Sequence, residues 1–362
     1  MNSVDPQTGE VIRFHDEVVG LTEALASQAA VAITNASLIE ETKALFESLI
    51  RVMATAIDAK SLYTGNHIER VALLNLFLAR AINEKTEGPL AGVQFSEKEL
   101  EEIRLAGWLH DVGKITTPEW VMDKATKLQA IYDRIGLIRM RYAFIKESVK
   151  ACSPRSDQCG KVQETSTTGD EELPARLDEL DQEIQFLEQC NKPSEFLDDE
   201  KLARLGQIAQ KTFEFESETH ARLTENELYN LSIRKGSLTS EEIQVMKDHV
   251  VETRKMLSQI PFKGHLKNVP LYAAQHHEKL NGTGYPDGLH EQDIPIQSRI
   301  LAVADFYEAL VAKDRPYKKP MPLEVAFSIL RKAAQNGEID SDILDILIED
   351  KVYERLEKGK EG

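Results

Sequence analysis

Apolar residues along this chain recur mainly at steps of three and four positions, the spacing that places them on one face of an α-helix. The longest such run lies between Glu17 and Lys60, where the chain has no proline and a single glycine. It is far longer than an ordinary globular helix, which favours a connector helix or a coiled coil. The apolar positions of this run are Leu21, Leu25, Ala29, Ala32, Ala36, Ile39, Phe46, Ile50, Met53 and Ile57.

Two more apolar stripes follow the same rule in the middle of the chain. One runs from Leu128 through Ile131 to Val149, and the other runs from Leu173 to Leu187. Both alternate steps of three and four, as heptad helices do. The polar stretch between them, residues 151–172, is typical of a loop. The pattern therefore predicts an antiparallel helical hairpin inserted at residues 128–230.

Helix-start signals divide the rest of the chain into further helices. Ser96 with Glu99 has the spacing of a capping box, and Thr239-Ser240-Glu241-Glu242 marks another helix N-terminus. Strand-like alternation is almost absent, apart from a short stretch at residues 11–14. We therefore predict an all-α protein: a helical bundle with a long N-terminal connector helix and an inserted helical hairpin.

Composition and charge narrow the classes of function. The net charge of −17 argues against a protein that coats DNA or RNA, because phosphate repulsion would not be offset. Residues 151–230 hold 19 acidic and 8 basic side chains, which marks the insertion as a module of its own. No apolar run approaches the roughly 20 residues that span a bilayer, and the N-terminus lacks a signal-peptide pattern.

The three cysteines are Cys152, Cys159 and Cys190. An odd count without a CxxC pair gives no disulfide framework, so we expect a reducing, cytoplasmic location. Because no CxxC pair is present, a metal site with cysteine thiolate ligands is also disfavoured.

Imidazoles and carboxylates are the candidate metal ligands. Taken singly, each has an ordinary alternative, such as a helix cap or a half-buried surface side chain. Asp305 is harder to dismiss, because it interrupts the apolar run 300–310, where an uncompensated carboxylate would be costly to bury. Asp111, between Leu109 and Val112, raises the same question. The full candidate set is His67, His110, Asp111, His249, His276, His277 and Asp305.

Helix geometry favours one shared site. His110 and Asp111 differ by about 100° around a helix axis, so both can face one cleft while pointing at neighbouring ions. A carboxylate in that position can bridge two metals with one oxygen each. Imidazole and carboxylate ligands without thiolate suit iron, manganese, zinc or nickel, and iron is the metal we expect first.

The order of these residues resembles the HD-GYP phosphodiesterases of the HD superfamily. The resemblance rests on His110-Asp111 with Lys114, on His276-His277-Glu278, and on Gly284-Tyr285-Pro286, together with Asp305 and the stretch 314–317. It covers residues 46–128 and 230–335 and implies an HD-superfamily helical bundle. It also implies hydrolysis of cyclic di-GMP to linear pGpG, and then GMP, by a hydroxide that bridges two metals.

The resemblance also assigns ligands. One metal would take His67, His110, Asp111 and Asp305, and the second would share Asp111 and take His249, His276 and His277. Some relatives place a glutamate before the first histidine and hold a third metal. Here no carboxylate lies between Lys60 and Asn66, so we expect two divalent metals.

Other residues of the motifs are expected to act on the substrate or the ligands. Lys114 would stabilise negative charge on the reacting phosphate, and Glu278 would orient a ligand histidine. The glycine-rich loop would let the backbone approach the nucleotide, and Tyr285 would stack on a guanine. The predicted substrate-binding residues are Gly284, Tyr285, Pro286, Arg315 and Lys318.

The N-terminal stretch from Phe14 to Ile39 resembles the closing helix of a GAF sensor domain. It implies that residues 1–45 end a sensor domain and begin a signalling helix, and that residues 46–362 form the catalytic domain, interrupted at 128–230. A homodimer through this helix and a protein partner at the insertion are expected. An amphipathic dimer helix without a sensor history remains an alternative.

Three other functions stay open at this point. The same loop could accept cyclic GMP-AMP, and a protein that binds a cyclic dinucleotide without turnover would need the same motifs. HD folds can also host di-iron oxygen chemistry, which the intact Gly-Tyr-Pro loop disfavours.

Overall fold

The computed structural model describes residues 3–12, 16–60, 66–151, 172–312 and 321–358. The chain divides into two compact units, Met1–Thr55 and Ala56–Gly362. Within the described residues, no helix is both long and apolar enough to cross a membrane. The prediction of an all-α protein is confirmed, and among the described residues the strands are confined to two short hairpins.

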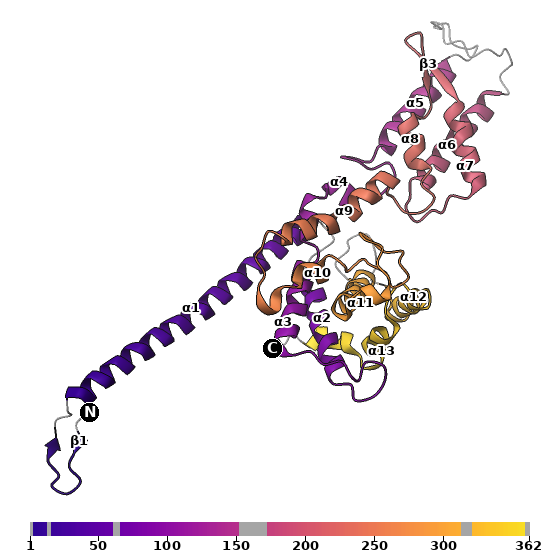
Figure 1. Ribbon diagram of the computed structural model, residues 1–362. Helices are drawn as coiled ribbons and strands as arrows, with labels where there is room; N and C mark the ends of the chain where they lie inside the picture. Colours follow the sequence, from indigo (N-terminus) through magenta and orange to yellow (C-terminus); the bar gives the residue numbers. More distant parts are fainter. Residues whose placement is uncertain (1–2, 13–15, 61–65, 152–171, 313–320, 359–362) are drawn as a thin grey trace. The chain divides into compact units, whose positions relative to one another are not determined.

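The first unit contains a short hairpin and most of the long helix. Strands β1 (Ser3–Val4) and β2 (Val11–Ile12) pair antiparallel, and α1 (Asp16–Lys60) follows (Figure 1). The long helix predicted from the apolar stripe is therefore present. Most of its side chains before residue 46 are exposed, including Leu25 and Ile39. The GAF-like origin of this unit stays a prediction.

The second unit is built around a bundle of helices with one apolar core. Helices α2 and α3 pack closely, α11 lies against α2, and α12 and α13 close the core on the other side (Figure 1). The core contains Leu78, Ile103, Leu301, Leu330 and Leu347, all almost fully buried. The elements of this bundle are α2 (His67–Asn83), α3 (Glu97–Leu109), η1 (Val112–Thr116), α4 (Glu119–Met122), α9 (Ser240–Leu257), η2 (Gly264–Leu266), α10 (Val269–Ala273), η3 (Glu291–Asp293), α11 (Ile296–Val311), α12 (Leu323–Gln335), α13 (Ser341–Glu349), η4 (Val352–Glu354) and α14 (Arg355–Lys358).

Capping boxes fix the starts of two helices in the bundle, at the two helix starts that the sequence predicts. The Ser96 hydroxyl accepts from the Glu99 amide while Glu99 accepts from the Ser96 amide, so α3 begins where the sequence indicates. Thr239 and Glu242 do the same at the start of α9. Each box satisfies backbone N–H groups that a helix start would otherwise leave unpaired.

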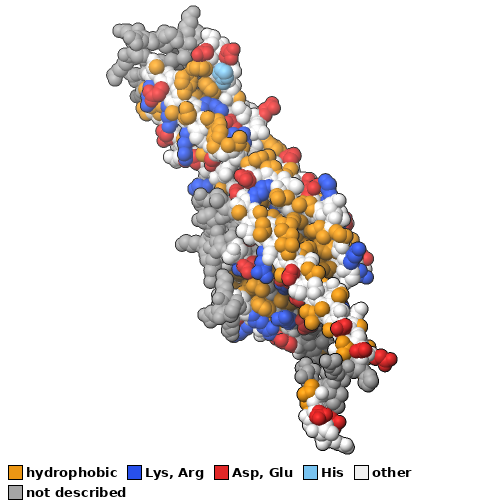
Figure 2. Space-filling view, turned by 90° about the vertical axis from the view of Figure 1, so that its left-hand side faces the viewer, with side chains coloured by type: hydrophobic (Ala, Val, Ile, Leu, Met, Phe, Trp, Pro, Cys, Tyr) orange, Lys and Arg blue, Asp and Glu red, His pale blue; other side chains and the backbone are white. Residues whose placement is uncertain are grey.

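The inserted module has its own core and is more than the predicted hairpin. Helices α5 (Ile135–Ala151) and α6 (Glu172–Cys190) do run antiparallel, because Arg139 pairs with Glu188 while Lys146 pairs with Asp181. They are followed by α7 (Asp199–Gln210), strands β3 (Thr212–Phe215) and β4 (Glu218–Ala221), and α8 (Glu225–Leu231). These elements complete the same buried core. Several large apolar side chains nevertheless stay on the module's surface (Figure 2).

Two details of the hairpin prediction are wrong for identifiable reasons. Ile131 continues the heptad spacing but is 93% exposed, because the chain between Leu128 and Ile135 forms turns and α5 begins only at Ile135. The β3–β4 hairpin was not predicted, because its turn uses Glu216 and Ser217 at positive φ instead of the glycine or asparagine that signals such turns.

Buried polar contacts tie the module to α9. The Lys124 ammonium donates to the Asn230 side chain at 3.0 Å and to both carboxylate oxygens of Glu242 at 2.8 Å. Ser237 donates to the Lys124 carbonyl. Because α9 also carries His249, the module contacts a helix that contributes to the candidate metal centre.

Candidate metal centre

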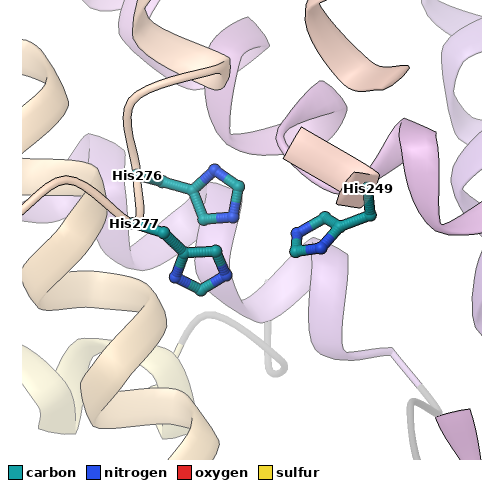
Figure 3. A group of neighbouring side chains, drawn as sticks. All are labelled: His249, His276 and His277. Carbon is teal, nitrogen blue, oxygen red and sulfur yellow. The ribbon is translucent and has the colours of Figure 1, made fainter. Parts of the chain in front are cut away.

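The structure brings all seven predicted ligands together from separate segments of the chain. His67 opens α2, while His110 and Asp111 follow the end of α3. His249 lies on α9, and Asp305 lies on α11. His276 and His277 lie in the turn after α10, and their rings face His249 (Figure 3).

Two glycines allow the close backbone contacts on which this convergence depends. A Cβ on Gly107 would lie 2.8 Å from the Ala72 Cα, so Gly107 sets the close packing of α3 on α2. A Cβ on Gly113 would lie 2.0 Å from the His249 carbonyl oxygen. The short η1 turn after Asp111 is thereby held against α9, which places His249 beside Asp111.

The Asp111 carboxylate stands between two groups of ligands. Its Oδ2 lies 3.3 Å from Nε2 of His110 and 3.7 Å from Nε2 of His67. Its Oδ1 lies 3.4 Å from Nε2 of His249 and 3.8 Å from Nε2 of His276. One carboxylate oxygen therefore faces each group, which is the arrangement of a bridging ligand.

The two groups differ in their other donors. Asp305 Oδ1 lies 3.3 Å from Nε2 of His67, and the ligand atoms of His67, His110 and Asp305 all lie within 4.8 Å of one another. The ligand atoms of His249, His276 and His277 meet the same limit. A third overlapping group consists of His110, Asp111 and His276, so the two sides are adjacent.

In three of the imidazoles one nitrogen is held by a backbone carbonyl, and the other is buried and directed into the centre. Nδ1 of His110 donates to the Gly107 carbonyl at 2.7 Å, and Nδ1 of His276 donates to the Ala273 carbonyl at 2.7 Å. Nδ1 of His249 donates in the same way to the Met246 carbonyl. These bonds leave each Nε2 directed into the centre, where the neutral form of the ring offers it as an acceptor for a metal.

Those acceptors have no hydrogen-bond donor among the residues that the structure describes. Nε2 of His110, His249 and His276 and Oδ1 of Asp111 are all buried and unpartnered there. Buried polar atoms without partners are rare, because each costs about 1–3 kcal/mol. A cluster of four acceptors therefore calls for a cation.

The spacing of the donors also fits metal coordination. Zinc–imidazole bonds are about 2.0–2.1 Å, so neighbouring ligand atoms on one ion lie about 3.0–3.4 Å apart. The contacts of His110 and His249 with Asp111, at 3.3 and 3.4 Å, agree with that spacing. The residues thus fit one divalent cation on each side of Asp111.

Sequence reasoning missed a second carboxylate on α11. Glu308 is 1% exposed, accepts from Nδ1 of His67, and accepts from Nε of Arg70 at 2.6 Å. It thus orients the His67 ring, the role that had been assigned to Glu278. A signal was available, because Glu308 lies one helical turn after Asp305 in an apolar helix, where a second acid also needs a partner.

Asp58, near the end of α1, was missed as well. Burial raises its pKa to about 6, although the nearby His67 lowers it. The sequence predicts no carboxylate close to His67, because residues 60–66 contain none. The structure brings one from farther upstream.

The ionised carboxylates of the centre favour cation binding, whereas a proton on His110 competes with it. Burial lowers the pKa of His110, but the carboxylates of Asp111 and Asp305 outweigh burial and raise it to about 9. Burial lowers the pKa of His277 to about 4 and holds that of His276 well below its usual value. Asp111 and Asp305 have lowered pKa values despite burial, because protonated histidines stand beside them.

Lys114 contacts the centre directly. Its ammonium donates to Asp111 Oδ2 and is also attracted by Asp305. It lies on the His67 and His110 side of the carboxylate. A cation there can offset negative charge that develops on a bound molecule.

Contacts within the Gly-Tyr-Pro loop and the residues beside it hold the loop in place, which the sequence did not predict. A Cβ on Gly284 would lie 2.3 Å from the Lys279 amide, so this glycine allows the loop to fold on itself. Glu278 does not orient a histidine, because its two oxygens accept from the backbone amides of Asp287 and Leu289. It therefore holds the segment that follows Pro286.

The Tyr285 ring contacts His277, one of the predicted metal ligands. Its ring centroid lies 4.8 Å from that of His277, and the Lys247 ammonium lies 5.2 Å from the Tyr285 ring. Tyr285 is only partly buried, and its contact with His277 places it at the border of the centre. Arg315 and Lys318, the other predicted substrate contacts, lie outside the described residues.

Comparison with known proteins agrees with this site. HD-domain family profiles match residues 64–147 and 225–343, and the segment between them lies within the insertion. The chain belongs to the HD-domain family. The predicted HD-superfamily bundle is therefore confirmed.

Curated relatives of this HD protein match over short regions. A cyclic di-GMP phosphodiesterase of Thermotoga maritima is 43% identical over 101 residues, which cover 26% of this chain and 25% of the relative. The cyclic di-GMP phosphodiesterase response regulator RpfG of Xanthomonas campestris pv. campestris is 38% identical over 32% of this chain and 30% of its own. The 3'3'-cGAMP-specific phosphodiesterase 1 of Vibrio cholerae serotype O1 is 35% identical over 31% of this chain and 25% of its own. Each match thus spans less than a third of the relative.

Proposed function

We propose that this HD protein is a metal-dependent phosphodiesterase that hydrolyses cyclic di-GMP to linear pGpG, and more slowly to GMP. The observation that carries the proposal is the buried cluster of imidazole acceptors around the Asp111 carboxylate. The names of the similar proteins supply the substrate class. The metal centre supplies the reaction class, because hydrolysis of a phosphodiester suits two adjacent divalent cations.

The ligand sets would hold one cation on each side of Asp111. His67, His110 and Asp305 would hold the first, and His249, His276 and His277 the second. When bound, the two ions lower the pKa of a coordinated water to about 7 and offset the negative charge of a phosphodiester. We propose iron first, with manganese, zinc or nickel as alternatives, because the donor set has no thiolate.

Protein groups would orient the substrate and offset its charge. Lys114 is placed to shift its ammonium from Asp111 toward a phosphate oxygen as charge develops there. Lys247 is the cation at the opposite border, beside Tyr285 and thus beside His277. A cyclic dinucleotide carries two phosphodiesters, so Lys247 would face the one that is not being cleaved.

The test is turnover by metal-loaded protein. Protein purified without oxygen and supplied with iron or manganese is mixed with cyclic di-GMP, and the products are separated by ion-pair chromatography. Linear pGpG should form, and the Asp111→Asn variant, which weakens the bridge, should lose at least about 100-fold in rate. A wild-type protein that binds both metals and cyclic di-GMP yet forms no linear product would instead be a sensor.

Cyclic GMP-AMP is the second candidate substrate. A similar protein from Vibrio cholerae is named for this nucleotide. Parallel kcat/KM measurements on both cyclic dinucleotides decide between them. A substrate preference of ten-fold or more for cyclic GMP-AMP would replace our first candidate.

Assembly belongs to the proposal as well. Val18, Leu25, Ile39 and Met53 on α1 are exposed apolar residues at heptad spacing, and a second copy of the helix would cover such a face. We propose a homodimer through α1 in a reducing, cytoplasmic setting. Sedimentation of a variant with Leu25→Lys and Ile39→Lys should then give a monomer.

A further inference from the structure

The inserted module presents an apolar face that its own fold leaves uncovered. Leu137, Met140 and Phe144 on α5 are 42%, 70% and 39% exposed. Their spacing of three and four places them on one side of the helix. The opposite side of α5 supplies Ile138 and Tyr142 to the module's core. A helix that fills a core with one side normally has a polar outer side.

Strand β3 extends this face. Phe213 and Phe215 share one side of the strand, and their ring centroids lie 6.1 Å and 5.0 Å from that of Phe144. Phe215 is 44% exposed. We call Leu137, Met140, Phe144 and Phe215 the α5 stripe. Figure 2 shows apolar side chains gathered on the surface of this module.

The α5 stripe is large enough to take part in binding. If a fully exposed large side chain offers about 200 Å², the four residues leave roughly 400 Å² accessible. A patch of that size lies within the range of the largest patches on ordinary monomers, and such patches are often functional. It is about half of what one partner contributes to a standard interface, so it fits a transient complex.

The charges around the α5 stripe are negative. Glu218 pairs across the hairpin with Phe215, and its side chain is 80% exposed. Glu216, next to Phe215, is exposed too. The nearby cations Arg139 and Lys146 are already matched by acids of α6, and Arg141 is matched by Glu227 of α8. Any occupant therefore meets an apolar centre with acids at the hairpin end.

We propose that the α5 stripe docks a basic amphipathic helix of a partner protein. A row of side chains at steps of three and four accepts the apolar side of a second helix, and lysines or arginines beside that side would meet Glu216 and Glu218. A second copy of this chain fits less well, because its own acidic hairpin would face the same acids. Anionic lipid and nucleic acid are disfavoured for the same reason.

The docking site is independent of the metal centre. The stripe residues lie on α5 and β3, and none of them contacts a predicted metal ligand among the described residues. Variants on the stripe should therefore leave metal content and turnover unchanged. A failure of the proposed phosphodiesterase activity would leave the docking proposal standing.

The probe is a labelled synthetic peptide of about 18 residues, five helical turns, with leucine at heptad positions and lysine elsewhere. Its binding to the full chain is followed by fluorescence anisotropy, against a matched peptide with glutamate in place of lysine. We expect a Kd on the order of micromolar for the lysine peptide. The double variant Leu137→Ser, Met140→Ser should weaken binding at least ten-fold, and Glu216→Gln with Glu218→Gln should weaken it several-fold.

The matched control is Phe196→Ser. Phe196 is 58% exposed and lies between α6 and α7, outside the α5 stripe, so this variant should bind as the wild type does. Circular dichroism verifies that every variant keeps its helices. The proposal is overturned if the Leu137/Met140 variant binds normally, if Phe196→Ser weakens binding equally, or if the glutamate peptide binds as tightly. It is also overturned if the wild type dimerises and the Leu137/Met140 variant does not, because a second copy would then be the occupant.

Discussion

Adding one methyl group to Gly113 should open the metal centre. A Cβ at this position would lie 2.0 Å from the His249 carbonyl oxygen and 2.5 Å from the Thr253 amide nitrogen. Both are backbone atoms of α9 and cannot turn aside as a side chain could. Ordinary van der Waals contact begins near 3.4 Å, so η1 and α9 must separate by 3.4 − 2.0 = 1.4 Å at this point.

That separation exceeds what a metal ligand set tolerates. Asp111 precedes η1 and His249 lies on α9, so their 3.4 Å contact lengthens as the two elements part. Ligand distances in metal sites are held within about 0.2 Å. The Gly113→Ala variant should therefore lose the metal bound by His249, while the His67 side retains its ligands. Overpacking should also cost about 1–3 kcal/mol, or about 2–4 °C in melting temperature per kcal/mol.

The assay combines elemental analysis with differential scanning calorimetry. The matched control is Gly136→Ala, where an added Cβ meets nothing within 4 Å and a helix should gain up to about 1 kcal/mol. Gly113→Ala should bind less metal and melt lower than wild type, whereas Gly136→Ala should do neither. Full metal content and an unchanged melting temperature in Gly113→Ala would refute the close-packing argument.

Three further predictions follow from the contacts around the centre. Thr253 is fully buried, and its hydroxyl accepts from the Gly113 amide and donates to the His110 carbonyl. The Thr253→Val variant should therefore lose about 1–3 kcal/mol in the free energy of unfolding measured in urea. The Thr253→Ser variant keeps the hydroxyl and should lose less, so equal losses would contradict the role of the hydroxyl. Glu308→Gln should weaken metal affinity about 10–100-fold in a chelator competition, because His67 loses its orienting carboxylate; the exposed Glu69→Gln is the control, and equal affinities in both variants would exclude this role. Because the pKa of His110 is raised to about 9 and that of His67 is raised too, metal uptake at pH 7 should release protons, detected with an indicator in weak buffer. Because the folded-state pKa values are raised, these protons stabilise the metal-free protein below about pH 6.5, and that stabilisation is lost as the pH rises through about 9. Proton release on metal uptake should therefore fade above pH 9. Metal affinity should rise as the pH approaches 9. Metal uptake at pH 7 without proton release would contradict the charge assignment.

The sequence by itself determined the helices and the type of chemistry. The capping boxes at Ser96 and Thr239 act through neighbouring residues, so a reader of the chain can place those helix starts. The ligand types were readable for a similar reason, since Asp305 stands in an apolar helix where an isolated acid is costly. Residue spacing and the cost of burying an acid both depend on short stretches of sequence, so both can be predicted without the tertiary structure.

Only the tertiary structure decided how the candidate residues divide and which side chains support them. The Asp111 carboxylate lies between the two groups of candidate ligands because α3, α9 and α11 meet there, and Gly113 permits that meeting through a close contact with His249, 136 residues away in sequence. Glu278 looked like a partner of the adjacent histidines, yet the fold turns it toward the Asp287 amide and gives the orienting role to Glu308. Such assignments depend on contacts between distant segments, and no local pattern fixes which side of a turn a side chain takes.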